Sequence, residues 1–282
     1  MSWIEAIILG LVQGLTEFLP VSSSGHLAIG KALFGIETAD LGFEVIVHAA
    51  TVLATIVVFR KDIVALLQGL FKWKLNGETR YILLIALSMI PVLIVGVFFK
   101  DSVEALFGSG LRVVGVALLV TACLLFFSET LAARRGEMPG QAGHDERVAG
   151  YDEKEAGGKM NWKSALWMGL AQAVAVIPGL SRSGSTIAAG LLSGVSKREV
   201  TRFSFLMVLV PILGEAFLDV VSGDFVAGSV GIVPLLLGFV SAFVSGLFAC
   251  RFMIAIVRKA RLKWFALYCV AVGLACLVST LI

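Results

Sequence analysis

Two short segments interrupt apolar stretches of the chain and decide how it folds: QGLTEFLPVSSSGH at residues 13–26 and PGLSRSGST at residues 178–186. The apolar runs that lead into them, residues 3–19 and 162–177, each break at a proline followed by a cluster of serine and glycine. Proline removes a backbone donor and disrupts a helix, and small polar residues favour turns. We therefore expect each run to turn back as a re-entrant hairpin instead of crossing a membrane.

The two segments also repeat each other. Matched residues are 159 positions apart in every case: Gln13 and Gln172, Ser22 and Ser181, Ser24 and Ser183, and Gly25 and Gly184. Each segment is followed by three long apolar runs, so a hairpin plus three spans is used twice. An odd number of crossings places the two halves in opposite orientations, which predicts an inverted-topology repeat.

The composition indicates an integral membrane protein. Of the 282 residues, 58% are hydrophobic and only 15% are charged, and the mean hydropathy is +0.95. A soluble domain carries about 25% charged residues. Six runs are apolar enough to cross a bilayer, which takes about 20 helical residues, and they lie at 42–59, 79–99, 111–131, 203–222, 229–250 and 264–282. We expect an all-α membrane protein, because helices satisfy their own backbone in lipid.

The charged residues predict the orientation of the chain. The net charge is only +3, and the basic residues gather in the connections at 60–80, 132–163 and 251–263. This pattern argues against a nucleic-acid partner, and it places the three connections in the cytoplasm and the C-terminus outside. The chain is interpreted as one membrane domain, residues 1–282, made of a first repeat at 1–131, a cytoplasmic linker at 132–161 and a second repeat at 162–282.

The repeated segments differ in the side chains that carry chemistry. The differing pairs are Glu17 and Val176, Ser23 and Arg182, and His26 and Ser185. One half therefore supplies an acid, a hydroxyl and an imidazole, and the other supplies a guanidinium. If the two turns meet, they form one asymmetric polar site.

Arg182 points to an anion as the ligand of that site. A guanidinium is costly to hold in a membrane without a partner, and its planar fork suits a phosphate. Backbone N–H groups at helix N-termini also favour anions. The alternative is that Arg182 forms a structural ion pair with Glu17.

Further interpretations concern the first segment and one histidine beyond it. Gln13 and Glu17 lie four residues apart on one helical face, where they could hold a divalent cation such as Mg²⁺, while Glu17 could equally orient His26. Ser23 and His26 are the candidate nucleophile and base, and attack by a water activated by His26 remains open. His48 is interpreted as a packing or cavity-lining residue.

With these residues in view, the sequence resembles the bacterial undecaprenyl pyrophosphate phosphatase family of the bacitracin-resistance type. Residues 13–26 resemble its first motif, an E/Q-x-x-x-E helix that runs into a serine-rich turn and a histidine. Residues 178–186 resemble its second motif, P-G-x-S-R-S-G-x-T. The functional positions implied by this resemblance are Gln13, Glu17, Ser22, Ser23, Ser24, His26, Ser181, Arg182, Ser183 and Thr186. Gln13 stands at a position where the family also has an acid, so the cation site here has one carboxylate.

The resemblance implies a hydrolase that converts undecaprenyl pyrophosphate to undecaprenyl phosphate and inorganic phosphate. This reaction recycles the lipid carrier for peptidoglycan synthesis, and so supports cell shape and bacitracin resistance. It also implies the bacterial cytoplasmic (inner) membrane as the location, a polyprenyl pyrophosphate lipid as the partner, and Mg²⁺ or Ca²⁺ as a cofactor. Within the site, the expected catalytic residues are Glu17, Ser23, His26 and Arg182. The residues expected to bind the substrate are Gln13, Ser22, Ser24, Ser181, Ser183 and Thr186. The assembly state stays open, with a homodimer as one option.

Two other classes of function were weighed against this one. A transporter or flippase for polyprenyl phosphates or anions would use the same inverted repeat with broken helices. It would not need the acid, hydroxyl and imidazole of the first segment. A purely structural membrane protein would not place Arg182 in a re-entrant turn.

Overall fold

The computed structural model describes the chain except residues 37–40, 108–109, 135–157, 223–229, 260–261 and 282. The described part is helical, with no strand and one isolated bridge between Gly158 and Val195. Its helices are α1 (Trp3–Phe18), α2 (Ser23–Leu33), α3 (Leu41–Val58), α4 (Arg60–Leu70), α5 (Gly77–Phe98), α6 (Lys100–Phe107), α7 (Gly110–Arg134), α8 (Trp162–Val174), α9 (Arg182–Leu192), α10 (Lys197–Ser222), α11 (Ile232–Lys259) and α12 (Lys263–Ser279). The predicted all-α class is confirmed.

The six apolar runs predicted as spans all fall on helices, namely α3, α5, α7, α10, α11 and α12. Within the described residues, α5, α7 and α11 are long and apolar enough to cross a membrane. A fourth candidate is formed by α3 and α4 together, which meet at a 73° bend. The sequence predicted only a connection at residues 60–80, whereas the structure has α4 there. Most of the predicted linker lies outside the described residues.

The breaks at the two prolines appear as predicted. Helix α1 ends at Phe18, just before Pro20, and α2 begins at Ser23; α8 ends at Val174, shortly before Pro178, and α9 begins at Arg182. Each of the two motifs therefore forms a helix–turn–helix unit whose turn holds the serine and glycine cluster.

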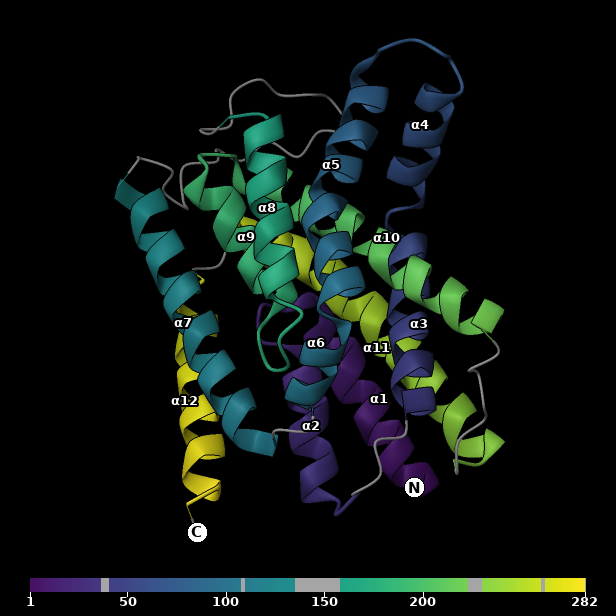
Figure 1. Cartoon of the computed structure of the whole chain (residues 1–282), viewed down its shortest axis with the longest axis vertical. Helices are drawn as coiled ribbons and strands as arrows, with labels where there is room; N and C mark the ends of the chain where they lie inside the picture. The colour runs from purple at the N-terminus through teal and green to yellow at the C-terminus, as the bar shows by residue number, and fades with distance from the viewer. Residues whose placement is uncertain (37–40, 108–109, 135–157, 223–229, 260–261, 282) are drawn as a thin grey trace.

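Each broken helix packs on a long helix from the other half of the sequence: α1 lies along α11, and α8 lies along α5 (Figure 1). The matched glycines Gly10 and Gly169 make these contacts close. A Cβ atom on Gly10 would lie 2.4 Å from the carbonyl oxygen of Gly238, and one on Gly169 would lie 2.4 Å from that of Ser88. Only glycine permits such an approach of two backbones.

Helices α7 and α12 also pack against each other, with α7 in contact with both α2 and α9. At their crossing, Gly115 and Gly273 face each other reciprocally. A Cβ atom on either glycine would lie 2.9 Å from the carbonyl oxygen of the other. This pair of helices borders both turns, so it fixes one side of the region where the two motifs meet.

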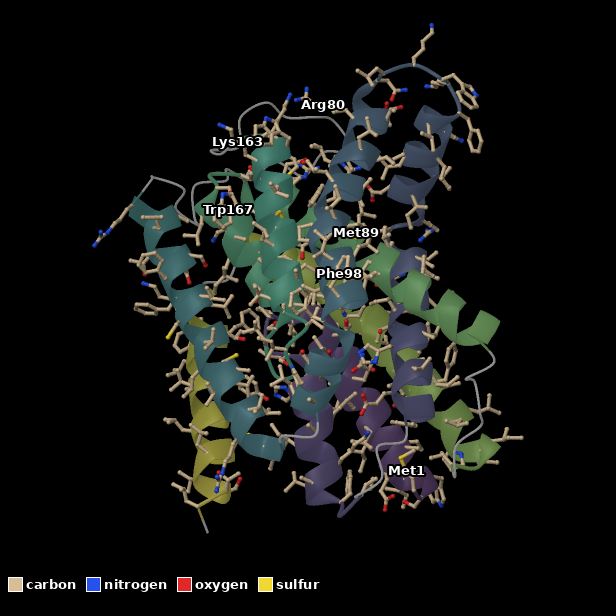
Figure 2. The ribbon with its side chains drawn as sticks, in the orientation of Figure 1. Met1, Arg80, Met89, Phe98, Lys163 and Trp167 are labelled. Carbon is tan, nitrogen blue, oxygen red and sulfur yellow. The ribbon has the colours of Figure 1, made fainter. Side chains whose placement is uncertain are left out.

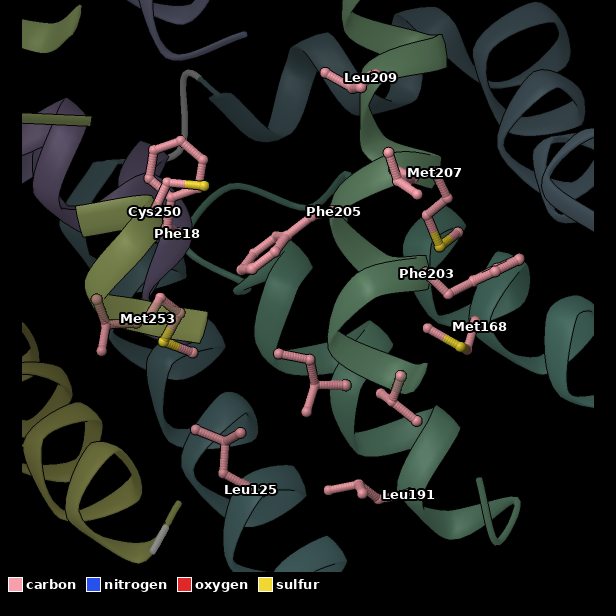
Figure 3. Close-up of a cluster of buried hydrophobic side chains, with 14 of the residues drawn as sticks. Phe18, Leu125, Met168, Leu191, Phe203, Phe205, Met207, Leu209, Cys250 and Met253 are labelled. Carbon is pink, nitrogen blue, oxygen red and sulfur yellow. The ribbon is translucent and has the colours of Figure 1, made fainter. Parts of the chain in front are cut away.

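The main apolar core joins α1, α7, α8, α9, α10 and α11 (Figure 3). Phe18 at the end of α1 packs edge-on against Phe205 of α10, with ring centroids 5.9 Å apart and an interplanar angle of 78°. Edge-to-face pairs add about 0.5–1.5 kcal/mol beyond the area they bury. This contact ties the end of α1, next to the first turn, to the second half of the chain.

Arg80 and Lys163 lie near one end of the molecule and Met1 near the other (Figure 2). Both chain termini lie at the end opposite the connection between α4 and α5 (Figure 1).

Candidate active site

The helices that follow the two turns are capped in the same way. Ser22 is the N-cap of α2 and its Oγ accepts a hydrogen bond from the Gly25 N–H at 3.2 Å. Ser181 is the N-cap of α9 and its Oγ accepts from the Gly184 N–H at 3.1 Å. A serine in this position satisfies one of the free N–H groups of the first helical turn. Each turn therefore ends in a helix N-terminus, which carries a partial positive charge.

The two turns touch each other. Ser183 Oγ donates a hydrogen bond to the Leu19 carbonyl oxygen at 3.0 Å, and the Gly179 N–H donates to Ser24 Oγ at 3.4 Å. A Cβ atom on Gly25 would lie 3.2 Å from the Gly179 Cα atom. The structure thus brings together the two motifs that the sequence predicted to share a site.

Glu17 is the centre of the polar cluster between the turns. Arg182 Nη2 donates to Glu17 Oε1 at 2.5 Å, and Ser23 Oγ donates to Glu17 Oε2. Gln13 Nε2 donates to the same Oε2 atom at 2.9 Å. The Glu17 side chain is only 8% exposed, so its charge is balanced mainly by Arg182, whose side chain is 27% exposed. The ion pair between Arg182 and Glu17, which the sequence left open as an alternative, is therefore present, and the candidate nucleophile Ser23 is hydrogen-bonded to the same carboxylate.

His48 lies closer to this cluster than the sequence suggested. Its Nε2 atom is 3.8 Å from Glu17 Oε2, and its Nδ1 atom lies 2.8 Å from the Glu44 carbonyl oxygen. His48, Thr51 and Thr55 share one face of the apolar helix α3, at spacings of three and four residues. Such a polar stripe in an apolar helix is a signal for function that could have identified His48.

His26 forms hydrogen bonds with residues other than Ser23. Its Nδ1 atom lies 2.7 Å from the Ser22 carbonyl oxygen, and its Nε2 atom lies 2.7 Å from the hydroxyl of Tyr268 on α12. The hydroxyl of Ser23 donates to Glu17 instead. The sequence paired Ser23 with His26; the structure pairs Ser23 with Glu17 and gives His26 a partner 242 residues away, which no local pattern could have indicated.

The remaining predicted residues make bonds within the protein. Ser22 and Ser181 are the helix caps, and Ser24 and Ser183 link the turns. Thr186 Oγ1 bonds to the Arg182 carbonyl oxygen at 2.9 Å and to Ser204 Oγ at 2.6 Å, and the side chain is buried. The side chains most open to a ligand are therefore those of Ser23, Ser24, His26 and Arg182.

A cavity adjoins the cluster between α1, α3, α9 and α10. Glu17, Arg182 and Ser183 form its polar end, and Phe205, Val208, Leu209 and Ile212 of α10 form an apolar wall. A site with a few charged groups beside an apolar surface suits an amphipathic ligand.

The residues predicted to hold a cation supply two kinds of oxygen. The Oε1 atom of Gln13 is buried and has no hydrogen-bond partner, so it is an acceptor that an ion or a water molecule would satisfy. Glu17 contributes the carboxylate. Mg²⁺ commonly takes one or two protein oxygens and completes its shell with water and phosphate oxygens. The pair fits such an ion, and no cluster of three or more His, Cys, Asp or Glu residues occurs among the described residues.

Comparison with known proteins gives consistent matches over the whole chain. A family model described as bacitracin resistance protein BacA matches residues 6–275. The undecaprenyl-diphosphatase of Parabacteroides distasonis is 54% identical over 286 residues, which cover 100% of both chains. That of Bacteroides fragilis is 53% identical, covering 99% of this chain and 98% of its own, and that of Oceanobacillus iheyensis is 37% identical, covering 98% and 96%.

Proposed function

This chain belongs to the family of the bacitracin resistance protein BacA, and from that membership we infer that it hydrolyses undecaprenyl pyrophosphate to undecaprenyl phosphate and inorganic phosphate. The observation that carries the mechanism is the contact of Glu17 with both Ser23 and Arg182, which joins the two motifs in one cluster. The reaction recycles a lipid carrier for the cell wall, as the family's description by bacitracin resistance also suggests.

Arg182 is proposed to bind the terminal phosphate. Its guanidinium is partly exposed at the cavity and pairs with a single carboxylate oxygen. A pyrophosphate entering the cavity would take up the remaining N–H groups of the fork, because charge-assisted bonds to phosphate are strong and bidentate. The N-termini of α2 and α9, both capped by serine, add to the positive potential at the same place.

Ser23 is proposed as the nucleophile, with Glu17 as its base. The Ser23 hydroxyl already donates to Glu17 Oε2, so the proton has an acceptor when Oγ attacks the terminal phosphorus. A bond forms between Oγ and phosphorus, the bond to the bridging oxygen breaks, and undecaprenyl phosphate leaves. Arg182 neutralises the charge on the transferred phosphoryl group, which is the main source of catalysis in such reactions.

Water then hydrolyses the phosphoserine. We assign His26 to this second step, as the base that takes a proton from the attacking water, because its ring lies one helical turn from Ser23 with Nε2 directed away from Ser22. The phosphorus–Oγ bond breaks, inorganic phosphate is released, and Ser23 regains the proton held by Glu17. A bound Mg²⁺ or Ca²⁺ would be held by Gln13 and Glu17 and would neutralise charge on the pyrophosphate.

The location and the symmetry of the fold are part of the same proposal. The protein is a membrane protein, and the cytoplasmic (inner) membrane is where a carrier for cell-wall synthesis works. Two observations support an inverted repeat. Helix α1 packs on α11 of the other half as α8 packs on α5, and Gly115 and Gly273 contact each other reciprocally. Reciprocal contacts are what a two-fold axis produces. In this arrangement the two turns are re-entrant and meet inside the membrane.

The test is release of inorganic phosphate from undecaprenyl pyrophosphate by the purified protein in detergent, with and without a chelator. The proposal expects release that the chelator abolishes and added Mg²⁺ restores. Movement of the lipid across proteoliposomes without release of phosphate would instead identify a transporter. Full activity after exhaustive chelation would remove the cation from the proposal.

A further inference from the structure

Tyr268 on α12 contacts the candidate active site from outside both motifs. Its hydroxyl lies 2.7 Å from His26 Nε2, and the two rings are parallel to within 8°, with centroids 5.6 Å apart. The next residue, Cys269, directs its Sγ atom at the Pro20 carbonyl oxygen at 3.7 Å. Two consecutive residues of α12 therefore contact the first motif, Tyr268 on α2 and Cys269 on the turn before it.

The contacts of His26 define its tautomer. The Ser22 carbonyl oxygen, 2.7 Å from Nδ1, can only accept a hydrogen bond, so Nδ1 carries a proton. In a neutral imidazole the other nitrogen then has a lone pair in the ring plane. The Tyr268 hydroxyl lies 2.7 Å from Nε2, so in this tautomer it is the donor of the hydrogen bond between them.

We propose that Tyr268 is a positioning residue for the hydrolysis: while Ser22 holds Nδ1 and sets the tautomer, the bond from Tyr268 fixes the rotation of the His26 ring that presents Nε2 as a proton acceptor at the site. The inference rests on the proposed function, because it concerns the base of the second step. The hydrogen bond at one ring nitrogen commonly sets which nitrogen of a histidine reacts, and Ser22 provides that bond here.

The exposure of Tyr268 suits this role. The side chain is 45% exposed although its hydroxyl is hydrogen-bonded. A water or phosphate oxygen that arrives at Nε2 can accept the hydrogen of the hydroxyl in its place, so the hydroxyl keeps a partner when it releases Nε2. Ser22 keeps hold of Nδ1 meanwhile, so the tautomer is unchanged.

The test is Tyr268→Phe, which removes the hydroxyl and keeps the ring. We expect kcat for phosphate release to fall about 3- to 10-fold, the range for one hydrogen bond. KM should not rise, since the phosphate is held by Arg182. In a His26→Ala background the same change should cost nothing further. Tyr81→Phe is the matched control, because the Tyr81 hydroxyl is buried without a partner and lies on α5; it should leave kcat unchanged.

A second measurement does not depend on activity. Diethylpyrocarbonate modifies the lone pair of a neutral imidazole, and mass spectrometry can follow His26 and His48 separately in one sample. Tyr268→Phe should speed modification of His26 several-fold and leave His48 as in the wild type. Wild-type kcat in Tyr268→Phe, an undiminished loss in the His26→Ala background, or an unchanged rate of His26 modification would each overturn the proposal. A wild-type protein that releases no phosphate would instead refute the proposed function.

Discussion

The contact between Arg182 and Glu17 yields the sharpest prediction, because it separates a catalytic guanidinium from a structural ion pair. Arg182→Ala removes a charged partner 2.5 Å from a carboxylate whose side chain is 8% exposed. Breaking a buried pair by deleting one partner costs about 3–5 kcal/mol. Glu17 keeps its hydrogen bonds from Ser23 and Gln13, so we expect the free energy of unfolding to fall by an amount near the lower end of this range, about 3 kcal/mol. This loss would be seen as a lower Tm in detergent.

The effect on turnover should be larger than this loss of stability explains. A guanidinium that stabilises a transferred phosphoryl group contributes about 10³-fold or more to kcat. A 10³-fold loss corresponds to about 4 kcal/mol of transition-state stabilisation. Folded Arg182→Ala protein, isolated by size-exclusion chromatography, should therefore lose at least about 10³-fold in phosphate release, and Arg182→Lys should lose less.

The decisive comparison is the double variant Glu17→Gln with Arg182→Ala. It removes both charges, so the Tm should recover toward the wild-type value because no buried charge is left unpaired. Activity should not recover, because Glu17 is also the proposed base of Ser23, so the double variant tests the origin of the Tm loss. If Arg182→Ala alone kept near-normal turnover, Arg182 would be a structural partner of Glu17 and the phosphate assignment would be wrong.

Three further predictions follow from the same contacts. Ser23→Ala should abolish turnover and the acid-stable phosphoserine detectable by mass spectrometry after rapid quenching; a variant that keeps a tenth of wild-type kcat would assign the attack to water. His48→Leu should lower kcat about 3- to 10-fold, since it removes a polar neighbour 3.8 Å from Glu17. His48→Gln keeps a polar side chain there and should retain most of the wild-type kcat. Equal effects of the two changes would show that only the packing of residue 48 matters. Gly169→Val should lower the Tm in detergent because its Cβ would lie 2.4 Å from the Ser88 carbonyl oxygen, whereas Gly96→Val, with open space around it, should not.

Hydropathy and local breakers were enough to predict the long apolar helices and the two broken ones. The six apolar runs all became helices, because backbone hydrogen bonds in an apolar chain must be satisfied locally. Pro20 and Pro178 ended their helices for equally local reasons, and the matched serines Ser22 and Ser181 became matched caps. Helix α4 was missed because it has only 11 residues and starts with three charged ones directly after a long apolar run, a pattern that is also typical of a connection.

The chemistry of the site depended on contacts that only packing decides. The repeat made it reasonable to expect that Arg182 meets Glu17, and it does. Nothing in the local sequence could show that Tyr268 bonds to His26 or that His48 lies near Glu17. Each pair joins two helices, and the relative positions of these helices follow from the packing of α12 on α7 and of α3 on α11. Sequence alone therefore determined which residues are polar within the apolar helices, whereas the tertiary structure decided which of them share a proton.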